Sequence, residues 1–441
     1  MKKMKVIVEL GSKRWLRSNT YRATANVIEL CEGIYIVETT LGGARYLFPV
    51  MRCSCRERDT VRINGTPYCE AEYCSDFLEK ISRCDGINIT AENPAFRRFS
   101  VKHPIAEDAT NPHILLSSNG EDLVLKGYRL YTSWNPEPLF LHFLSDKQLT
   151  PKLKLSYSYK GSPLGILTEF IKGAIDPGSI LYSSLVRTLT GEGLIVPLDD
   201  IKAASQTIAR FHNVMLSCTE NWCTPRTANE TDVDRWRKRT LFYLSNILKF
   251  EPSQSIKRIL LNLKNPLFDE FIDQRIIATH QDLHFSQMLK WGENLFIIDF
   301  EGEPGRPDEY RRDLEPPLRD LASTLRALSY IAFFALLEVN RIDKQRTMQL
   351  LYSNSQQVEL AREWTIHVAE KLIEEYARYV KRDIVESTSP SEILEFLKPW
   401  FVERALYEAY YESSYRPENT MIALSTLANN IPPILDAKII M

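Results

Sequence analysis

Hydrophobic positions along this chain follow two different spacings, which change near residue 178. Before that point, short apolar runs such as VIVEL, GIYIVETTL and ARYLFPV are separated by turn residues. Runs of this kind are typical of β-strands, and LGGAR between the last two predicts a hairpin turn. We therefore expect a β-rich subdomain over residues 1–97.

The segment from residue 98 to residue 177 continues the strand pattern and adds one helix. The tight turn SNGED precedes a strand that ends in LVLKGYRL, and the proline-marked turn WNPEP precedes the helical run LFLHFLSD. The run LGILTEF reads as a further strand that leads into a Gly/Pro connector. These features predict a small β lobe with one helix.

From residue 178 onward, apolar residues recur at intervals of three and four, as in IKAASQTIARFHNVML and LRDLASTLRALSYIAFFALLEV. This spacing places them on one face of a helix. The strand-rich exception is HQDLHFSQMLKWGENLFIIDF, which starts at residue 280. The pattern as a whole predicts an α+β, bilobal fold with a cap at 1–97, an intermediate lobe at 98–177 and a helical C-terminal lobe at 178–441.

Composition and charge narrow the classes of partner. The net charge is −2, and 44% of the residues are hydrophobic. No global field therefore favours nucleic acid or an anionic membrane, and no apolar run is long enough to predict a transmembrane helix. The start, MKKMKVIVELGSKRW, has too short an apolar stretch for a signal peptide. We expect a cytoplasmic monomer that binds neither nucleic acid nor membrane.

Five of the eight cysteines lie between residues 53 and 84, which raises the question of a zinc site. The spacings C-x-C and C-x4-C differ from the C-x2-C of zinc ribbons, and no histidine lies among them. Buried thiols, or one or two disulfides in a protein from a hyperthermophile, are the preferred interpretation.

Three oxygen-bearing side chains are expected to converge in the strand-rich island. If residues 292–294 form a three-residue hairpin turn, Gln287 lies opposite Asp299 on one face of the ribbon. A two-residue turn would shift this register by one. Asp282 lies in the loop that enters the same end of the hairpin. Carboxylate and amide oxygens suit Mg²⁺.

The same residues satisfy the requirements of phosphoryl transfer. The loop H-x-D-x-x-x-x-[NQ] followed by a strand-borne D-F supplies an acid for the acceptor hydroxyl, Asp282, and two metal ligands, Gln287 and Asp299. Lys126, in the apolar strand LVLKGYRL, supplies the phosphate contact. The four residues together predict an ATP- and Mg²⁺-dependent kinase. A loop at residues 105–114 lies in the right place to cover the phosphates, although it contains no glycine.

The two histidines of the island have a simpler interpretation than metal binding. His280 and His284 would share a face only on a helix, whereas the sequence predicts a loop followed by a strand. We therefore expect His280 to brace the loop.

Longer motifs resemble the maltokinase family, which is related to the aminoglycoside phosphotransferases. The motifs are HQDLHFSQ, IIDFEGEPGRP, PLRDLA, LKGYRL with WNPE, the N-terminal KRW and the C-terminal ALYEAYYESSYRP. They run from about residue 14 to residue 424. The resemblance implies a kinase-like fold and the transfer of phosphate from ATP, with Mg²⁺, to the anomeric hydroxyl of maltose. It implies that Asp282 is the base, that Gln287 and Asp299 bind the metal, and that Lys126 contacts the phosphates.

Two positions depart from the family pattern. Gln281 stands where the family usually has glycine, in the catalytic loop. Leu139 stands where a glutamate would pair with Lys126, although Glu137 is close by.

Candidate contacts to the acceptor come mainly from the helical lobe. In YEAYYESSYRP, tyrosines and glutamates four residues apart share helix faces and could stack on and hydrogen-bond a sugar, or form an aromatic core stripe with a solvated acidic face. The arginine and aspartate of PLRDLA could contact substrate or form a structural pair at a helix start, and the glutamate after DF could bind metal or sugar or be solvated. These candidates are Glu301, Arg319, Asp320, Tyr407, Glu408, Tyr411 and Glu412.

Three functions remain open from the sequence. Maltokinase is the first, and a glucosamine or other small-molecule kinase on the same scaffold is the second. A catalytically silent nucleotide- or sugar-binding protein is the third, because Gln281 and Leu139 depart from the pattern.

Overall fold

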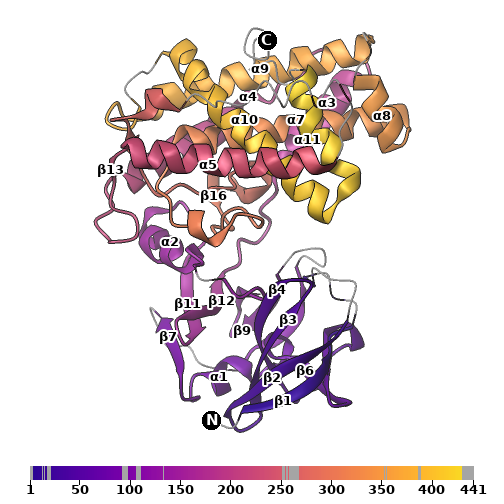
Figure 1. The fold of residues 1–441 in the computed structure, drawn as a ribbon, viewed down its shortest axis with the longest axis vertical. Helices are drawn as coiled ribbons and strands as arrows, with labels where there is room; N and C mark the ends of the chain where they lie inside the picture. The colour runs from indigo at the N-terminus through magenta and orange to yellow at the C-terminus, as the bar shows by residue number, and fades with distance from the viewer. Residues whose placement is uncertain are drawn as a thin grey trace. The chain divides into compact units, whose positions relative to one another are not determined.

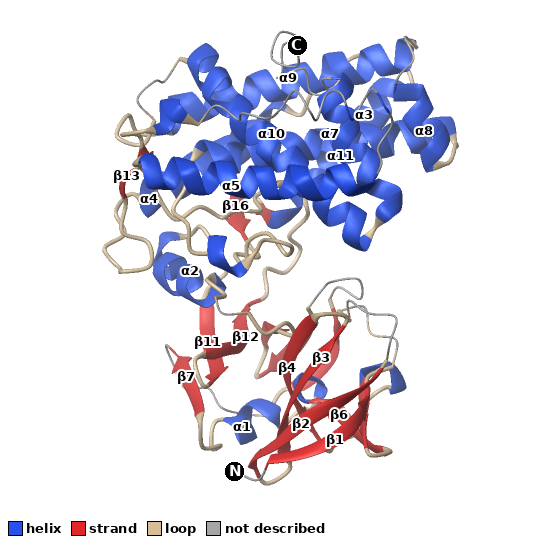
Figure 2. Ribbon diagram, viewed as in Figure 1, coloured by secondary structure: helices blue, strands red, loops and turns tan. Residues whose placement is uncertain are grey.

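The computed structural model forms two compact units, Met1–Lys172 and Gly173–Met441 (Figure 1). The first unit is built mainly of strands and the second mainly of helices (Figure 2). The residues that the structure describes are 3–11, 13, 15–16, 21–91, 98–105, 111–132, 134–250, 254, 257, 268–351, 353, 355–385 and 389–429.

The first unit begins with a closed six-stranded barrel. Its strands follow the order β1-β2-β3-β4-β6-β5, and Gly42 and Gly43, both at positive φ, make the LGGAR turn between β3 and β4. Apolar side chains such as Val27, Val37 and Phe48 fill the interior. Closure leaves no exposed strand edge. The strands are β1 (Lys3–Glu9), β2 (Arg22–Cys31), β3 (Ile34–Leu41), β4 (Ala44–Met51), β5 (Thr60–Ile63) and β6 (Thr66–Glu70).

A six-stranded antiparallel sheet completes the first unit, in the order β7-β11-β12-β10-β9-β8. Asn119 and Gly120, both at positive φ, form the two-residue turn expected at SNGED. β7 falls within the range predicted for the cap but pairs with β11 of this sheet. The strands are β7 (Ile87–Ala91), β8 (Ser100–Pro104), β9 (His113–Ser118), β10 (Glu121–Gly127), β11 (Leu153–Tyr159) and β12 (Ser162–Glu169), with helices α1 (Phe77–Ile81) and α2 (Glu137–Leu144).

The second unit is a helical assembly in which α7 and α10 pack against each other and α5 lies along α10 (Figure 1). Among the described residues, α7 is the one helix long and apolar enough to cross a membrane, and 61% of its most apolar window is buried. Burial of this kind is typical of a core helix. The helices are α3 (Pro177–Leu189), α4 (Leu198–Met215), α5 (Glu230–Ile247), α7 (Leu318–Asn340), α8 (Lys344–Leu351), α9 (Gln356–Tyr379), α10 (Pro390–Tyr415) and α11 (Thr420–Asn429).

Short strands in the second unit correct the predicted hairpin register. β13 (Arg226–Thr227) pairs with β14 (Arg275–Ile276), and β15 (Met288–Trp291) pairs with β16 (Asn294–Ile297). Trp291 lies opposite Asn294, so the β15–β16 turn has two residues and the predicted three-residue turn is wrong. A two-residue turn with a glycine at positive φ in its first position, here Gly292, matches the twist of a hairpin.

All eight cysteines form disulfides, so the structure has neither free thiols nor a zinc ligand set of thiolates. Three disulfides lie in the first unit and one in the second. The prediction of buried thiols is therefore wrong, and the alternative of one or two disulfides underestimated their number. The pairs are Cys31–Cys84, Cys53–Cys74, Cys55–Cys69 and Cys218–Cys223.

Two sequence features fall partly outside the described residues. These are Arg14 of the KRW motif and residues 106–110 of the proposed phosphate-covering loop.

Candidate active site

The loop that carries Asp282 is fastened to the first turn of α7. The buried carboxylate of Asp320 accepts hydrogen bonds from the backbone N–H groups of His280 (2.7 Å) and Gln281 (2.9 Å). Arg319 donates to the Gln281 carbonyl at 2.9 Å. Both α7 residues are fully buried and each holds the loop, which is a structural role other than the pair at a helix start considered from the sequence.

His280 lies at the centre of this loop. Its Nε2 lies 2.9 Å from the carbonyl of Ile298, and the backbone N–H of Asp282 donates to its Nδ1 at 3.3 Å. The imidazole therefore links the loop to the residue that follows β16. Among the described residues, neither His280 nor His284 belongs to a group of three possible metal ligands. Burial lowers the pKa of His284 and thereby favours its neutral form.

Gln281 adopts the left-handed backbone conformation that the family pattern assigns to glycine. Its φ is +71°, which costs a residue with a Cβ about 1–2 kcal/mol. Its buried amide donates from Nε2 to the carbonyl of Arg311 at 3.2 Å. The side chain lies against Gly302, where an added Cβ would come within 2.7 Å of the Gln281 Oε1. Glutamine fits at position 281 because its amide has a hydrogen-bond acceptor and because Gly302 leaves room for its side chain.

Asp282 has a cationic partner that the sequence did not reveal. Nη2 of Arg404, on α10, donates to Oδ1 of Asp282. The same guanidinium donates to Glu303 at 2.8 Å and to Glu408 at 3.1 Å, and it lies 4.8 Å from the centre of the Tyr407 ring. Burial opposes the charged form, but the surrounding carboxylates raise the pKa of Arg404 well above its usual value. Arg404 is therefore a fixed cation beside Asp282.

Gln287 and Asp299 meet despite the corrected register. Nε2 of Gln287 donates to Oδ2 of Asp299 at 3.1 Å, and the Gln287 carbonyl accepts from Ile298 at 3.0 Å. Gln287 lies in the short 3₁₀ turn before β15, and Asp299 lies beyond the end of β16 with φ of +65°. The amide and the carboxylate are half-buried. The side-chain oxygens of Gln287 and Asp299 come from adjacent segments and are the kind of hard ligand that suits Mg²⁺. A bound Mg²⁺ ion also retains several of its own waters.

Glu301 lies in a turn beyond the end of β16 at Ile297, and its carboxylate oxygen lies within 4.8 Å of that of Asp299. This arrangement fits the alternative in which Glu301 helps to bind a metal.

In the first unit, Lys126 does have a glutamate partner. Its Nζ lies 2.7 Å from Oε2 of Glu137, and both side chains are buried. Tyr128 donates to the same oxygen at 2.8 Å. Glu137 opens α2, whose start is set by Pro136, so the pair joins β10 to this helix. The departure at Leu139 reflects a shift of the glutamate by two positions.

A network of buried ion pairs lies next to the loop that carries Asp282. Glu303 accepts from Arg319 at 2.5 Å and from Arg404 at 2.8 Å. Although burial favours the neutral acid, the adjacent guanidinium groups hold the pKa of Glu303 below its usual range. Charges this deeply buried require paired partners. The network extends through Arg239, Arg306, Glu315 and Glu403.

Among the candidate sugar contacts on α10, Tyr411 is half-buried, and the others, Tyr407, Glu408 and Glu412, are buried. Tyr407 and Tyr411 stack with ring centres 6.2 Å apart. Glu408 bonds to Arg326 at 2.5 Å as well as to Arg404, and Glu412 bonds to Arg416 at 2.7 Å. Burial raises the pKa of Glu412. The alternative of a solvated acidic face is therefore wrong, and the carboxylates are held in fixed positions.

Sequence reasoning missed Arg404, Glu303 and the anchoring role of Asp320. The available signal for Arg404 was its position one helical turn before Glu408, since arginine and glutamate four residues apart pair on a helix. No local pattern connects Arg404 to Asp282, which lies 122 residues earlier in the chain.

Comparisons with known proteins place this geometry in context. No family model matches the chain. A glucosamine kinase of Mycolicibacterium smegmatis is 24% identical over 176 residues, which cover 38% of this chain and 42% of that enzyme. The aligned region thus spans less than half of the relative's length.

Solved structures of glucosamine kinase resemble nearly the whole chain. A complex with glucosamine, ADP and inorganic phosphate has a TM-score of 0.61 at 15% identity, covering 96% of this chain and 98% of that one. A second crystal form has a TM-score of 0.61 at 17% identity, covering 92% and 93%. The chain therefore has the α+β, kinase-like bilobal fold that the sequence predicted, shared with glucosamine kinase.

Proposed function

We propose that this protein is a sugar kinase that transfers the γ-phosphoryl group of ATP to a hydroxyl group. The observation that carries the proposal is the loop of Asp282, held by Asp320 and Arg319, with Gln287 against Asp299 beside it. Phosphoryl transfer depends mainly on positioning and charge stabilisation, so a rigid acid beside a pair of metal ligands is the expected arrangement.

In the proposed reaction, each residue has a separate task. Asp282 accepts a hydrogen bond from the acceptor hydroxyl and takes its proton late in the transfer. Lys126, held by Glu137, contacts the phosphates of ATP. Gln287 and Asp299 hold Mg²⁺, which when bound neutralises charge on the phosphate oxygens. Arg404 keeps the carboxylate of Asp282 in one orientation.

The acceptor we favour is glucosamine. Support comes from the sequence relative and from the two solved structures, all of which are glucosamine kinases. The buried carboxylates of Glu408 and Glu412 would suit the hydroxyl and ammonium groups of such a sugar. Maltose is the second candidate, because the motifs HQDLHFSQ and ALYEAYYESSYRP resemble maltokinases. We further propose that the enzyme acts as a cytoplasmic monomer.

An acceptor screen tests the proposal. ADP release should be measured with ATP and Mg²⁺ against glucosamine, maltose, glucose, trehalose and aminoglycosides. We expect turnover on glucosamine, and turnover on maltose alone would transfer the assignment to the second candidate. Nucleotide binding without turnover on any acceptor would favour a silent binding protein.

The variant Asp282→Asn tests the role of the base, because it keeps the size of the side chain and removes the proton acceptor. It should lower kcat by several orders of magnitude while nucleotide binding remains. Nearly full activity of this variant would refute the role of Asp282.

A further inference from the structure

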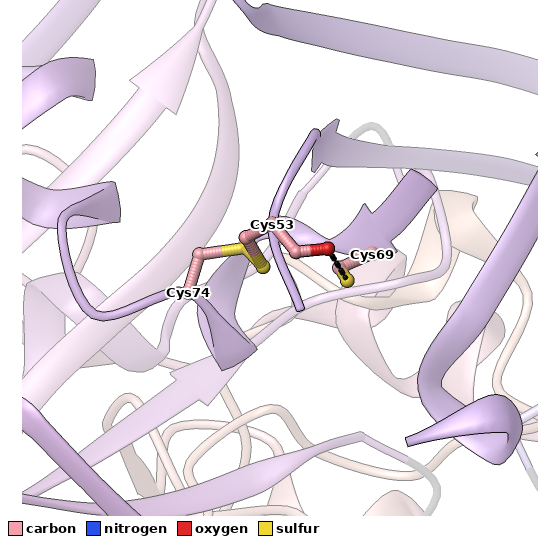
Figure 3. Close-up of side chains that lie close together, drawn as sticks. All are labelled: Cys53, Cys69 and Cys74. Atoms are coloured by element: carbon pink, nitrogen blue, oxygen red, sulfur yellow. Dashed lines mark hydrogen bonds between the residues drawn. A yellow bond between two sulfur atoms is a disulfide. The ribbon is translucent and has the colours of Figure 1, made fainter. Parts of the chain in front are cut away.

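Four cysteines of the first unit bring two disulfides into close proximity. The loop after β4 contributes Cys53 and Cys55, and the segment from the end of β6 contributes Cys69 and Cys74. The sulfur atoms of Cys53, Cys69 and Cys74 all lie within 4.8 Å of one another (Figure 3). The Cys69 sulfur lies 3.1 Å from the Cys53 carbonyl. Sulfur atoms of two different disulfides are therefore close enough to exchange partners after a small side-chain rotation.

The four sulfurs differ in access. Cys53 is exposed and Cys55 is half-buried, whereas Cys69 is 2% and Cys74 is 4% exposed. Both residues of the Cys218–Cys223 disulfide are also buried. Arginines flank the accessible pair in the sequence RCSCRER, and nearby positive charge stabilises thiolates. An external thiolate thus meets Cys53 first.

We propose that these four cysteines form a thiol–disulfide relay in which reduction at Cys53 is passed to Cys55. An external thiolate attacks the Cys53 sulfur, forms a mixed disulfide there and releases the thiolate of Cys74. That thiolate attacks Cys69, which forms a Cys69–Cys74 disulfide and releases the thiolate of Cys55. A second external thiol resolves the mixed disulfide at Cys53.

The balance of the relay is complete. Two external thiols become one external disulfide, and the two protons they lose appear on Cys53 and Cys55. Two protein disulfides become one, so two electrons enter the protein. The reductant is a low-molecular-weight thiol such as glutathione.

The product of the relay has a precedent within the same chain. Cys69 and Cys74 are five residues apart, as are Cys218 and Cys223, which form a disulfide with a Cα–Cα distance of 5.8 Å. A disulfide across this spacing is therefore sterically accessible. After exchange, no disulfide links the loop of Cys53 and Cys55 to β6 or to the segment that follows β6.

Buried ion pairs connect the loop of Cys53 and Cys55 to the segment that follows Lys126. Glu70 and Glu72 lie between Cys69 and Cys74, and together they hold Arg129 with four hydrogen bonds of 2.7–3.0 Å. Arg129 is fully buried and follows Lys126 by three residues. Glu70 also binds Lys13, whose Nζ donates to the carbonyl of Arg58 in the released loop. Given the proposed function, reduction should therefore weaken ATP binding at Lys126.

Labelling of thiols during a glutathione titration tests the relay. The oxidised protein is treated with rising concentrations of reduced glutathione and with EDTA, blocked with N-ethylmaleimide, and mapped by non-reducing peptide mass spectrometry. We expect Cys53 and Cys55 to be labelled together and a new Cys69–Cys74 disulfide to form while Cys218–Cys223 is intact. Early labelling of Cys53 and Cys74, with Cys55–Cys69 preserved, would overturn the relay.

Two double variants make the result independent of one mapping experiment. Cys55→Ser with Cys69→Ser removes the second disulfide, so labelling should move to Cys53 and Cys74. Cys53→Ser with Cys55→Ser imitates the relay product and should form the Cys69–Cys74 disulfide. The absence of that disulfide in the second variant would overturn the proposal even if the first variant fails to fold.

Nucleotide affinity separates this proposal from the proposed function. The product-like variant Cys53→Ser with Cys55→Ser should bind ATP severalfold more weakly than the oxidised wild type, and the control Cys218→Ser with Cys223→Ser should bind normally. Equal affinity in the product-like variant and the wild type would refute the link to Lys126. Failure of the oxidised wild type to bind ATP would instead refute the proposed function and leave the thiol chemistry unaffected.

Discussion

Replacing Gln281 by glycine and by alanine should give an unusual order of stability. Glycine removes the left-handed strain, about 1–2 kcal/mol, whereas alanine retains it. Both substitutions lose the hydrogen bond to the Arg311 carbonyl, about 1 kcal/mol, and the buried methylene groups. Alanine recovers only about 0.8 kcal/mol by burying its methyl group. The glycine variant should therefore be more stable than the alanine variant by the difference of these two terms, about 0.2–1.2 kcal/mol.

Guanidinium unfolding followed by tryptophan fluorescence measures this difference. Gln206, in the middle of α4, provides the matched control, because glycine in a helix is less stable than alanine by about 1 kcal/mol. The two positions should show opposite orders. If alanine at position 281 is as stable as glycine there, the left-handed strain does not govern this site and the reasoning fails. The backbone bond from Gln281 to Asp320 persists in both variants, so both should retain nucleotide binding.

Three further predictions concern buried charges. Arg404→Leu leaves several buried carboxylates without their shared cation, so the free energy of unfolding in chemical denaturation should fall by about 3–5 kcal/mol. Arg404→Lys should partly recover kcat, and an unchanged stability of Arg404→Leu would contradict the network. Glu137→Gln should raise the KM for ATP more than the KM for the acceptor, because it loosens Lys126, and equal changes would argue against a specific role. Burial raises the pKa of Glu412 above its unfolded value, so its stabilising contribution is complete below the unfolded pKa and is lost as pH rises through the folded pKa. Glu412→Gln should therefore raise Tm at neutral pH more than at pH 4, and a uniform shift would refute this.

Local patterns predicted the elements of the fold well. The LGGAR and SNGED turns lie where glycine or asparagine permits positive φ, and the long helices coincide with the three- and four-residue spacing of apolar positions. These features depend on residues close in sequence. The hairpin of β15 and β16 shows the limit of such counting, because the choice between a two- and a three-residue turn at Gly292 is a small energetic difference.

The contact between Gln287 and Asp299 was expected for a reason that proved wrong. The predicted cross-strand register does not exist, yet the side chains meet because Asp299 turns out of the strand at positive φ and Gln287 precedes it in a 3₁₀ turn. The contact between the two side chains is observed, whereas their role as metal ligands stays a prediction. The sequence could not describe the backbone that brings them together.

Long-range ion pairs were beyond reach for a different reason. Arg404 contacts Asp282 across 122 residues, and Lys13 contacts Glu70 across most of the barrel. An arginine on a helix offers the same pattern whether it is solvated or buried, so only the packing of α10 against the loop distinguishes the two cases. The cysteine pairs pose the same problem, because the eight cysteines allow 105 pairings and spacing alone selects none.

In the proposed mechanism, Arg404 connects the acceptor site to Asp282. Its guanidinium binds the proposed base with Nη2 and Glu408, a proposed sugar contact, with Nε. A planar guanidinium transmits displacement at one edge to the other, because its donors are fixed relative to one another. An acceptor that fits poorly against Glu408 would therefore tilt Asp282 away from the hydroxyl group. Discrimination between sugars should accordingly fall on kcat as well as on KM, since the misplaced base acts only in the transition state.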